Sequence, residues 1–111
     1  MKLPNAELAI IDPRKLRNYA LSLLHPVGRF KAAFFSRLGF TAENWERLDL
    51  ELRRMAVSET AELGERTPFG QKYLIRAFLL GPKGVRAKIR SVWIILDGEQ
   101  APRLVTILPE D

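Results

Sequence analysis

The chain has 111 residues, of which 47% are apolar and 28% charged, and it contains no cysteine. This balance excludes a disordered chain and predicts a single domain over residues 1–111. No apolar run approaches the roughly 20 residues of a membrane span, and nothing resembles a signal peptide, so we expect a cytoplasmic protein without disulfides. The net charge of +5, from 18 Lys and Arg against 13 Asp and Glu, favours nucleic acid or an acidic protein as partner.

The first half of the chain is predicted to be helical, after an extended lead-in over residues 1–12. Asp12 followed by Pro13 is a helix-start signal, because an aspartate caps a helix well and proline fits its first turn. This helix is expected to end at Leu24, because Pro26 disfavours the helical conformation in the residue before it. Its predicted apolar stripe consists of Leu16, Tyr19, Ala20, Leu23 and Leu24.

Two more helices are predicted before the chain changes character. The second begins near Val27 and ends at Gly39, a residue type that commonly terminates helices. Its predicted apolar stripe consists of Phe30, Ala33, Phe34 and Leu38. The third follows the capping residue Thr41 and is expected over about residues 42–63. Its buried face is predicted from apolar residues three and four apart, namely Trp45, Leu48, Leu52 and Met55.

From Gly64 onward the sequence favours strands. After a loop over 64–70, strands are predicted over 71–80, 85–96 and 102–108, with a tight turn at 81–84. Residues 85–96 alternate between an apolar face and a face that carries Arg86, Lys88 and Arg90. Short connections between consecutive strands predict an antiparallel meander. The expected fold class is α+β, with about three N-terminal helices packed on a C-terminal antiparallel meander of three or more strands.

The available side chains limit the chemistry that the chain can perform. With one histidine, no cysteine and no metal-binding or phosphate-loop motif, neither a metal nor a cofactor is expected. The remaining cations, hydroxyls and single imidazole are the groups that metal-independent RNA cleavage uses. In that reaction a 2′-hydroxyl loses a proton and attacks the adjacent phosphorus, the 5′-oxygen gains a proton, and positive charge stabilises the phosphate oxygens.

The segment HPVGRFK, residues 25–31, is the strongest candidate for such a site. His25 is suited to act as acid or base, because an imidazole titrates near neutral pH. Lys31 and an arginine are suited to hold a phosphate. Gly28 permits close approach of the backbone, and amides at a helix N-terminus favour an anion. In the alternative interpretation, the segment only joins two helices and its cations are solvated.

Other candidates lie on the predicted strands. Arg76 stands among apolar residues, and a half-buried guanidinium needs an anion or carbonyl partner. Tyr73 or Thr106 is suited to donate a hydrogen bond to a phosphate. The three cations of the strand 85–96 form a row that would contact phosphates without reading sequence, or that simply faces solvent.

These motifs resemble a small uncharacterised bacterial domain that occurs alone and as a C-terminal module of larger proteins, including secreted toxins. The similarity spans about residues 3–109 and is carried by four motifs: HPVGRFKAAFF at 25–35, GPKG at 81–84, SVWII at 91–95, and PRLVT at 102–106 followed by Pro109.

More distantly, helices leading into a meander that ends in PRLVT resemble the barnase–EndoU–colicin–RelE group of RNase toxins. These toxins cleave RNA, often tRNA or mRNA, without a metal. The resemblance implies roles for His25 and Lys31 on the helical side and for Thr106 on the last strand. Many of these RNases have a second histidine, which this chain lacks, so a Lys or Arg would have to fill one proton-transfer or charge-stabilising role.

The first hypothesis is therefore a metal-independent endoribonuclease, a toxin of a toxin–antitoxin pair, with RNA (tRNA or mRNA) as substrate and a small acidic antitoxin-like protein as partner. His25 would act as general acid/base, Lys31 and Arg76 would stabilise phosphate charge, and Thr106 would position it. Substrate binding is assigned to Arg29, Tyr73, Arg86, Lys88 and Arg90. The alternatives are a non-enzymatic basic module that binds an acidic protein or nucleic acid, and an immunity-like protein, although those are often acidic.

Overall fold

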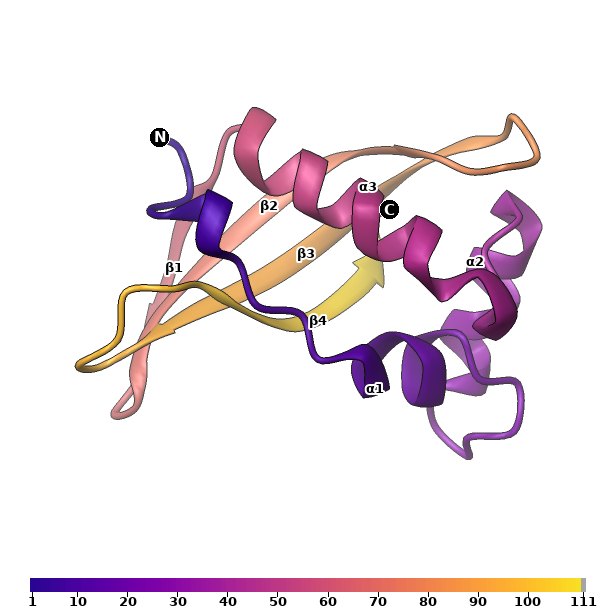
Figure 1. Ribbon diagram of the computed structural model, residues 1–111, viewed down its shortest axis with the longest axis horizontal. Helices are drawn as coiled ribbons and strands as arrows, with labels where there is room; N and C mark the ends of the chain where they lie inside the picture. Colours follow the sequence, from indigo (N-terminus) through magenta and orange to yellow (C-terminus); the bar gives the residue numbers. More distant parts are fainter. Residues whose placement is uncertain (111) are drawn as a thin grey trace.

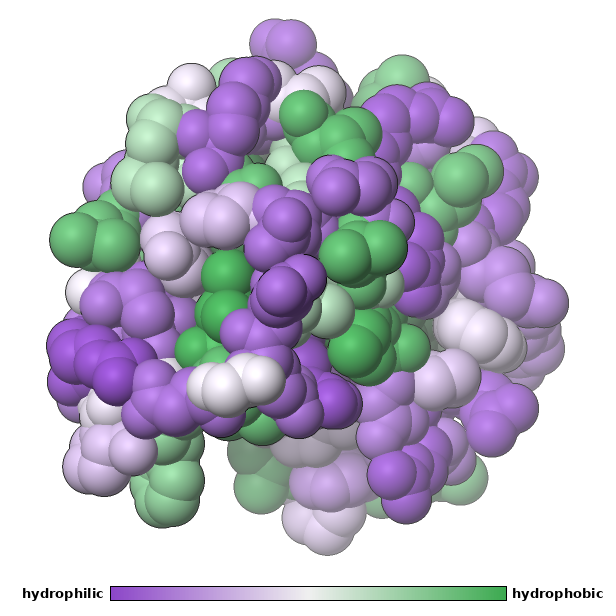
Figure 2. Space-filling model, turned by 60° about the vertical axis from the view of Figure 1, so that its left-hand side comes forward, coloured by the Kyte–Doolittle hydropathy of each residue, from purple (hydrophilic) through white to green (hydrophobic). Residues whose placement is uncertain are grey.

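Residues 1–110 are described by a computed structural model, in which the helices of the first half pack on a four-stranded sheet formed by the second half (Figure 1). The predicted α+β class, with N-terminal helices and a C-terminal antiparallel meander, is confirmed. No helix in the described part of the chain is both long and apolar enough to cross a bilayer. On the face that Figure 2 shows, hydrophilic residues dominate and apolar residues form small separate groups.

The first helical segment is shorter than the sequence predicts. Helix α1 spans Pro13–Lys15 and continues as a π-helical turn, η2, over Leu16–Ala20. Asp12 caps α1 as predicted, because its carboxylate accepts a hydrogen bond from the backbone amide of Arg14. The amide of Leu21 bonds back to the Leu16 carbonyl at 2.8 Å, and this wide turn ends the helix. Leu23 and Leu24, which the prediction places in the apolar stripe, are therefore exposed.

Helix α2 spans Arg29–Leu38 and ends, as predicted, at Gly39, whose φ of 102° is a conformation that other residues rarely adopt. The predicted apolar stripe of this helix is right at Leu38, and at Phe34, which packs against the core, but wrong at Phe30 and Ala33, which are exposed. The buried residues are Ala32, Phe35 and Leu38, whereas Phe30 is 70% exposed. Both stripes contain a phenylalanine, so the apolar pattern alone does not decide which side of the helix meets the sheet.

Helix α3 spans Trp45–Ser58 and follows a single 3-10 turn, η3, over Ala42–Asn44, which Thr41 and Asn44 close as a capping box. The prediction that this helix continues to residue 63 is wrong. Glu59 is already extended, and the amide of the buried Ala61 donates to the Met1 carbonyl at 2.7 Å. A local sequence pattern cannot predict this contact, because the two residues are sixty positions apart in the chain.

The sheet contains strands β1 (Glu62–Arg66), β2 (Gly70–Leu80), β3 (Arg86–Leu96) and β4 (Arg103–Pro109), all antiparallel and in sequential order. Strand β1 replaces the end of the predicted third helix and the first three residues of the predicted loop 64–70. Between β3 and β4 the register shifts, so that Val92 opposes Thr106 but Trp93 opposes Leu104. This β-bulge leaves Val105 as the extra residue on β4.

The core lies between the helices and one face of the sheet. Its most deeply buried side chains include Leu16, Phe35, Leu48, Leu52, Ile75, Ile89, Trp93 and Ile107. Ser91 is the buried polar residue among them, and its hydroxyl accepts a hydrogen bond from the Trp93 indole at 3.0 Å. As the alternation of 85–96 predicts, Arg86, Lys88 and Arg90 lie on the opposite face from Ile89, Ser91 and Trp93.

The N-terminal segment places α1 and η2 beside the edge strand β4. Ile10 forms a parallel bridge with Arg103. Its amide donates to the Pro102 carbonyl at 2.8 Å, and its carbonyl accepts from the Leu104 amide at 2.9 Å. The lead-in is not extended throughout, as the sequence predicts, because it contains a 3-10 turn, η1, over Ala6–Leu8; after this turn Ile10 pairs with β4 before the chain enters α1. This pairing creates the space between the first helical segment and β4 in which the candidate site lies.

Candidate functional site

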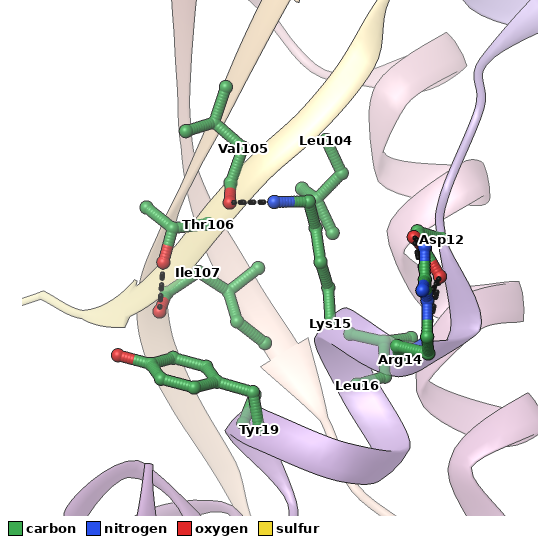
Figure 3. A pocket seen from close by; sticks show the side chains of 10 residues that line it. Asp12, Arg14, Lys15, Leu16, Tyr19, Leu104, Val105, Thr106 and Ile107 are labelled. Carbon is green, nitrogen blue, oxygen red and sulfur yellow. Dashed lines mark hydrogen bonds and ion pairs between the residues drawn. The ribbon is translucent and has the colours of Figure 1, made fainter. Parts of the chain in front are cut away.

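A hollow of about 610 Å³ opens between α1, η2 and the edge strand β4 (Figure 3). One wall is formed by the helical segment and the other by the strand around its bulge. The lining residues are Asp12, Arg14, Lys15, Leu16, Tyr19, Ala20, Leu104, Val105, Thr106 and Ile107. Lys15 reaches across the hollow, where its Nζ donates to the Val105 carbonyl at 3.2 Å. The hollow is thus a solvent-open space between an apolar floor and a cationic rim.

Lys31 joins this hollow from helix α2. Its Nζ donates a hydrogen bond to Thr106 Oγ1 at 2.8 Å and lies 5.0 Å from the ring centre of Tyr19. No carboxylate of residues 1–110 lies within 4.0 Å of this ammonium. Burial lowers the pKa of Lys31 from its ordinary value of 10.5. The side chain is therefore a half-buried cation that lacks an acidic partner in the described part of the chain.

His25 also contacts Tyr19. The two rings meet edge-on, with their centres 4.8 Å apart. His25 Nδ1 accepts hydrogen bonds from the amides of Val27 and Gly28 at 3.1 and 3.0 Å. The proton of the neutral ring therefore resides on Nε2. Because His25 and the Lys31 ammonium each lie within about 5 Å of the Tyr19 ring centre, they are no more than about 10 Å apart.

Gly28 allows the turn after His25 to pack against η2. A Cβ atom at this position would lie 2.1 Å from the Tyr19 carbonyl oxygen, so no other residue fits without displacement. The prediction of a close backbone approach is confirmed, but the approaching group is this carbonyl. The amides of Val27 and Gly28 are taken by His25 Nδ1, and that of Arg29 donates to the His25 carbonyl at 3.1 Å. These three amides are thus not free to bind the predicted anion.

The charge around the hollow is strongly positive. Residues 13–40 contain six of the 18 Lys and Arg but none of the 13 Asp and Glu, so the remainder of the chain carries twelve cations against thirteen acids. Asp12 is the acidic residue that lines the hollow, and it is paired with Arg14 at 2.7 Å. Hydrogen bonds from the Arg14 side chain and amide lower the pKa of Asp12 to about 2. Neither Lys15 nor Lys31 has a carboxylate of residues 1–110 within 4.0 Å.

Arg76 does not join the hollow. It lies on β2, two strands from Thr106, where its guanidinium contacts both oxygens of Glu62 and lies 3.5 Å from Glu110. The hydrogen bonds to Glu62 raise the pKa of Arg76 above the ordinary value of an arginine. The anion that the sequence predicts for this guanidinium is thus supplied from within the chain. Arg90 lies in the same row and pairs with Glu110 at 3.7 Å.

The other predicted binding residues are dispersed. Tyr73 opposes Trp93 on the helix-covered face of the sheet and packs against the core. Arg86 lies over the ring of Phe78 at 4.4 Å and, like Lys88, is exposed on β3. Arg29 is exposed at the start of α2. Of the residues predicted from sequence, His25, Lys31 and Thr106 come together around one aromatic ring.

Tyr19 and Lys15 are the residues of this site that sequence reasoning missed. Tyr19 is assigned by its spacing to the apolar stripe of the first helix, and it does pack against the core with part of its ring. Its ring also contacts Lys31 and His25. A tyrosine within a basic helical segment is the signal that could have singled it out, because its polar end usually seeks a partner when the ring is buried.

Among residues 1–110, no group of three His, Cys, Asp or Glu side chains is placed to hold a metal ion.

The fold is shared with a solved structure. A chain of a contact-dependent growth inhibition toxin–immunity protein complex from Klebsiella pneumoniae 342 superposes with a TM-score of 0.70 at 17% sequence identity, over 96% of this chain and 97% of that chain. At this identity the likeness shows a common fold.

No curated protein sequence matches this chain. A family model described as a domain of unknown function, DUF6883, matches residues 2–111. Because that match spans nearly the whole chain, the protein belongs to the DUF6883 family.

Proposed function

We propose that this domain is a toxin-type, metal-independent endoribonuclease. The observation that carries the proposal is the position of the Lys31 ammonium, which is half-buried, bonded to the Thr106 hydroxyl and close to the ring of Tyr19, which His25 also contacts, beside a basic hollow. A cation that serves only to stabilise the fold usually has an acidic partner when its head group is buried. A phosphate of RNA would supply the missing negative charge.

The two titratable groups around Tyr19 divide the proton transfers between them. Lys31 rests as an ammonium; its neutral form, which burial favours by lowering its pKa, accepts the proton of the 2′-hydroxyl and then, as an ammonium again, neutralises charge on the phosphate. As the 2′-oxygen forms its bond to phosphorus, the bond from phosphorus to the 5′-oxygen breaks. The 5′-oxygen takes a proton from the imidazolium form of His25, which thereby becomes the neutral ring. The products are a 2′,3′-cyclic phosphate and a 5′-hydroxyl, and no water is consumed.

The remaining residues of the hollow position the phosphate. The Thr106 hydroxyl holds the Lys31 amine in place, and Lys15 supplies a second cation that is already directed across the hollow. In this scheme Lys15 takes the charge-stabilising role that the sequence assigned to Arg76. The lysine pair also fills the place of the second histidine that many RNase toxins have and this chain lacks.

The structural neighbour supports a toxin-like role. The complex from which it comes contains a toxin and an immunity protein, so the fold occurs in a system of growth inhibition and protection. The net charge of +5 and the unopposed cations at the hollow favour the toxin side of such a pair over an immunity-like protein, because RNA is a polyanion.

The direct test is cleavage of RNA by the purified protein in EDTA. Total tRNA and a defined mRNA are incubated with wild type, His25→Ala, Lys31→Met and the control Lys72→Met, which removes the same charge from a half-buried lysine on β2. We expect cyclic phosphate ends with wild type and Lys72→Met, and rate losses on the order of 10²–10³ for the two site variants. Unchanged cleavage by both site variants would refute the proposal.

A second candidate function is a basic module that binds nucleic acid without cleaving it. The observation that favours it is the exposed Phe78 on β2, which carries Arg86 above its ring and opposes Lys88 across the strands, away from the hollow. Exposed aromatic rings flanked by cations bind single strands by stacking and charge. Such a module would bind RNA with affinity that falls steeply with salt, would retain binding in His25→Ala, and would lose it in Arg86→Ala.

A further inference from the structure

Exposed apolar side chains lie on both sides of His25 in the sequence. In the loop between η2 and α2, Leu23, Leu24 and Val27 are 65%, 93% and 60% exposed, and Phe30 in the first turn of α2 is 70% exposed. This loop extends from the body at the lower right of Figure 1. Single exposed apolar residues are ordinary, but a group of large ones within eight positions of the chain marks an interaction surface.

A groove beside this group gives the surface its shape. It has a volume of about 340 Å³ and runs between Leu23 and Leu24 of the loop on one side and Ala32 and Phe40 on the other. Protein interfaces place anchor side chains of one partner in such pockets, which become fully desolvated. A bilayer surface would contact the protruding leucines but would leave the groove unfilled. The combination of protruding and concave apolar surface therefore fits a protein partner.

The charge around the group indicates what kind of protein it is. Arg29 lies over the Phe30 ring at 4.9 Å, Lys31 follows in the same helix, and residues 13–40 contain no acidic side chain. Glu43, at the far end of the groove, is the acidic residue that lines it. Interfaces match positive surface with negative surface, which speeds association and excludes wrong partners. A small acidic protein complements this region.

We propose that Leu23, Leu24, Val27 and Phe30, with the adjoining groove, form the docking surface for a small acidic protein that covers His25. This inference rests on the proposed function, because covering His25 inhibits the protein only if that imidazole takes part in cleavage. His25 lies between Leu24 and Val27 in the chain and contacts Tyr19 at the hollow. A partner seated on the apolar group therefore blocks the approach of RNA to the imidazole.

The test first looks for a short acidic reading frame adjacent to this gene, whose absence would count against the inference, and then titrates its product calorimetrically against the full chain. Leu24→Ser and Phe30→Ser are compared with controls of similar exposure outside the region, Leu63→Ser at 65% and Phe69→Ser at 73%. We expect the two surface variants to weaken binding at least about tenfold, the controls to bind like wild type, and circular dichroism to show all four folded. Equal binding by all variants, or no binding by wild type, overturns the inference.

Other occupants of the surface give different results, each of which overturns the proposal. Sedimentation of wild type with phosphatidylcholine–phosphatidylglycerol vesicles, lost in Leu24→Ser, would assign the surface to a membrane. A dimer in light scattering that dissociates in Phe30→Ser would assign it to a second copy of the chain.

Failure of this inference is distinguishable from failure of the nuclease proposal. If wild type cleaves no RNA but binds the acidic protein through Leu24 and Phe30, the docking surface stands and the nuclease fails. If wild type and Leu24→Ser cleave RNA equally and the acidic protein inhibits both with the same affinity, the nuclease stands and the docking surface fails.

Discussion

Replacing Gly28 with alanine tests the packing that holds His25 against Tyr19. The φ and ψ of Gly28, −65° and −21°, are those of a right-handed helix, so conformational preference alone would make alanine stabilising by about 0.5–1 kcal/mol. The added Cβ, however, would lie 2.1 Å from the Tyr19 carbonyl oxygen, whereas Cβ atoms essentially never come within 3.0 Å of another heavy atom. The turn and η2 must therefore separate by roughly 1 Å.

Such overpacking costs about 1–3 kcal/mol, so after the conformational gain we expect Gly28→Ala to lower the free energy of unfolding by about 1–2 kcal/mol. Urea unfolding followed by circular dichroism would show this as a midpoint lower by roughly 0.5–1 M. The exposed helical residue Ala33 of α2 provides the control, because Ala33→Gly measures the cost of glycine in this helix without a steric term. A Gly28→Ala protein more stable than wild type would refute the close contact.

Three further predictions concern the site and the core. Ser91→Ala removes the acceptor of the buried Trp93 indole, so we expect a loss of about 1–3 kcal/mol in urea unfolding; an unchanged midpoint would contradict this hydrogen bond. Lys31→Met should not lower stability at neutral pH. Burial lowers the pKa of Lys31, so at alkaline pH the unfolded chain binds more protons than the folded protein. The free energy of unfolding of wild type should therefore rise relative to that of Lys31→Met as the pH rises toward 10.5. A relative decrease over this pH range would refute the direction of the pKa shift. NMR titration should give Asp12 a pKa of about 2, so the contribution of this carboxylate to stability is lost as the pH falls through that value. In Arg14→Ala the pKa of Asp12 should rise toward 3.8 without reaching it, because the backbone amide at position 14 still donates to the carboxylate.

The sequence predicted the strands of the meander well, because their signals are local. Alternation over 85–96 identifies one buried and one polar face, and the turns at 81–84 and 97–98 are marked by glycine. Strand β1 gives no such signal, because it is short, contains Gly64 and has an exposed Leu63. It exists because its residues pair with β2, with Glu62 opposite Leu74, and pairing between distant residues is not visible in a local pattern.

The helices show where apolar periodicity fails. In the first helix the stripe is right as far as Ala20, but Leu23 and Leu24 continue the pattern after the π-turn has ended the helix. In α2 the predicted Leu38 is buried, but Ala32 and Phe35 are buried in place of the predicted Phe30 and Ala33. In both places the sequence offers more apolar residues than the core can accept. The apolar residues that the core does not accept, Leu23, Leu24 and Phe30, are exposed and form part of the candidate docking surface.

By itself, the sequence determined the α+β class, the order of helices before strands, the basic character of the protein and the choice of His25, Lys31 and Thr106 as candidates. It could do so because these properties depend on residue types and on spacing along the chain. Only the tertiary structure decided which candidates meet. The bridge from Ile10 to β4 brings η2, with Tyr19, beside Thr106, while the sheet register places Arg76 against Glu62 and Glu110. Both outcomes depend on contacts between residues far apart in the chain, whose geometry exists only once the core has formed.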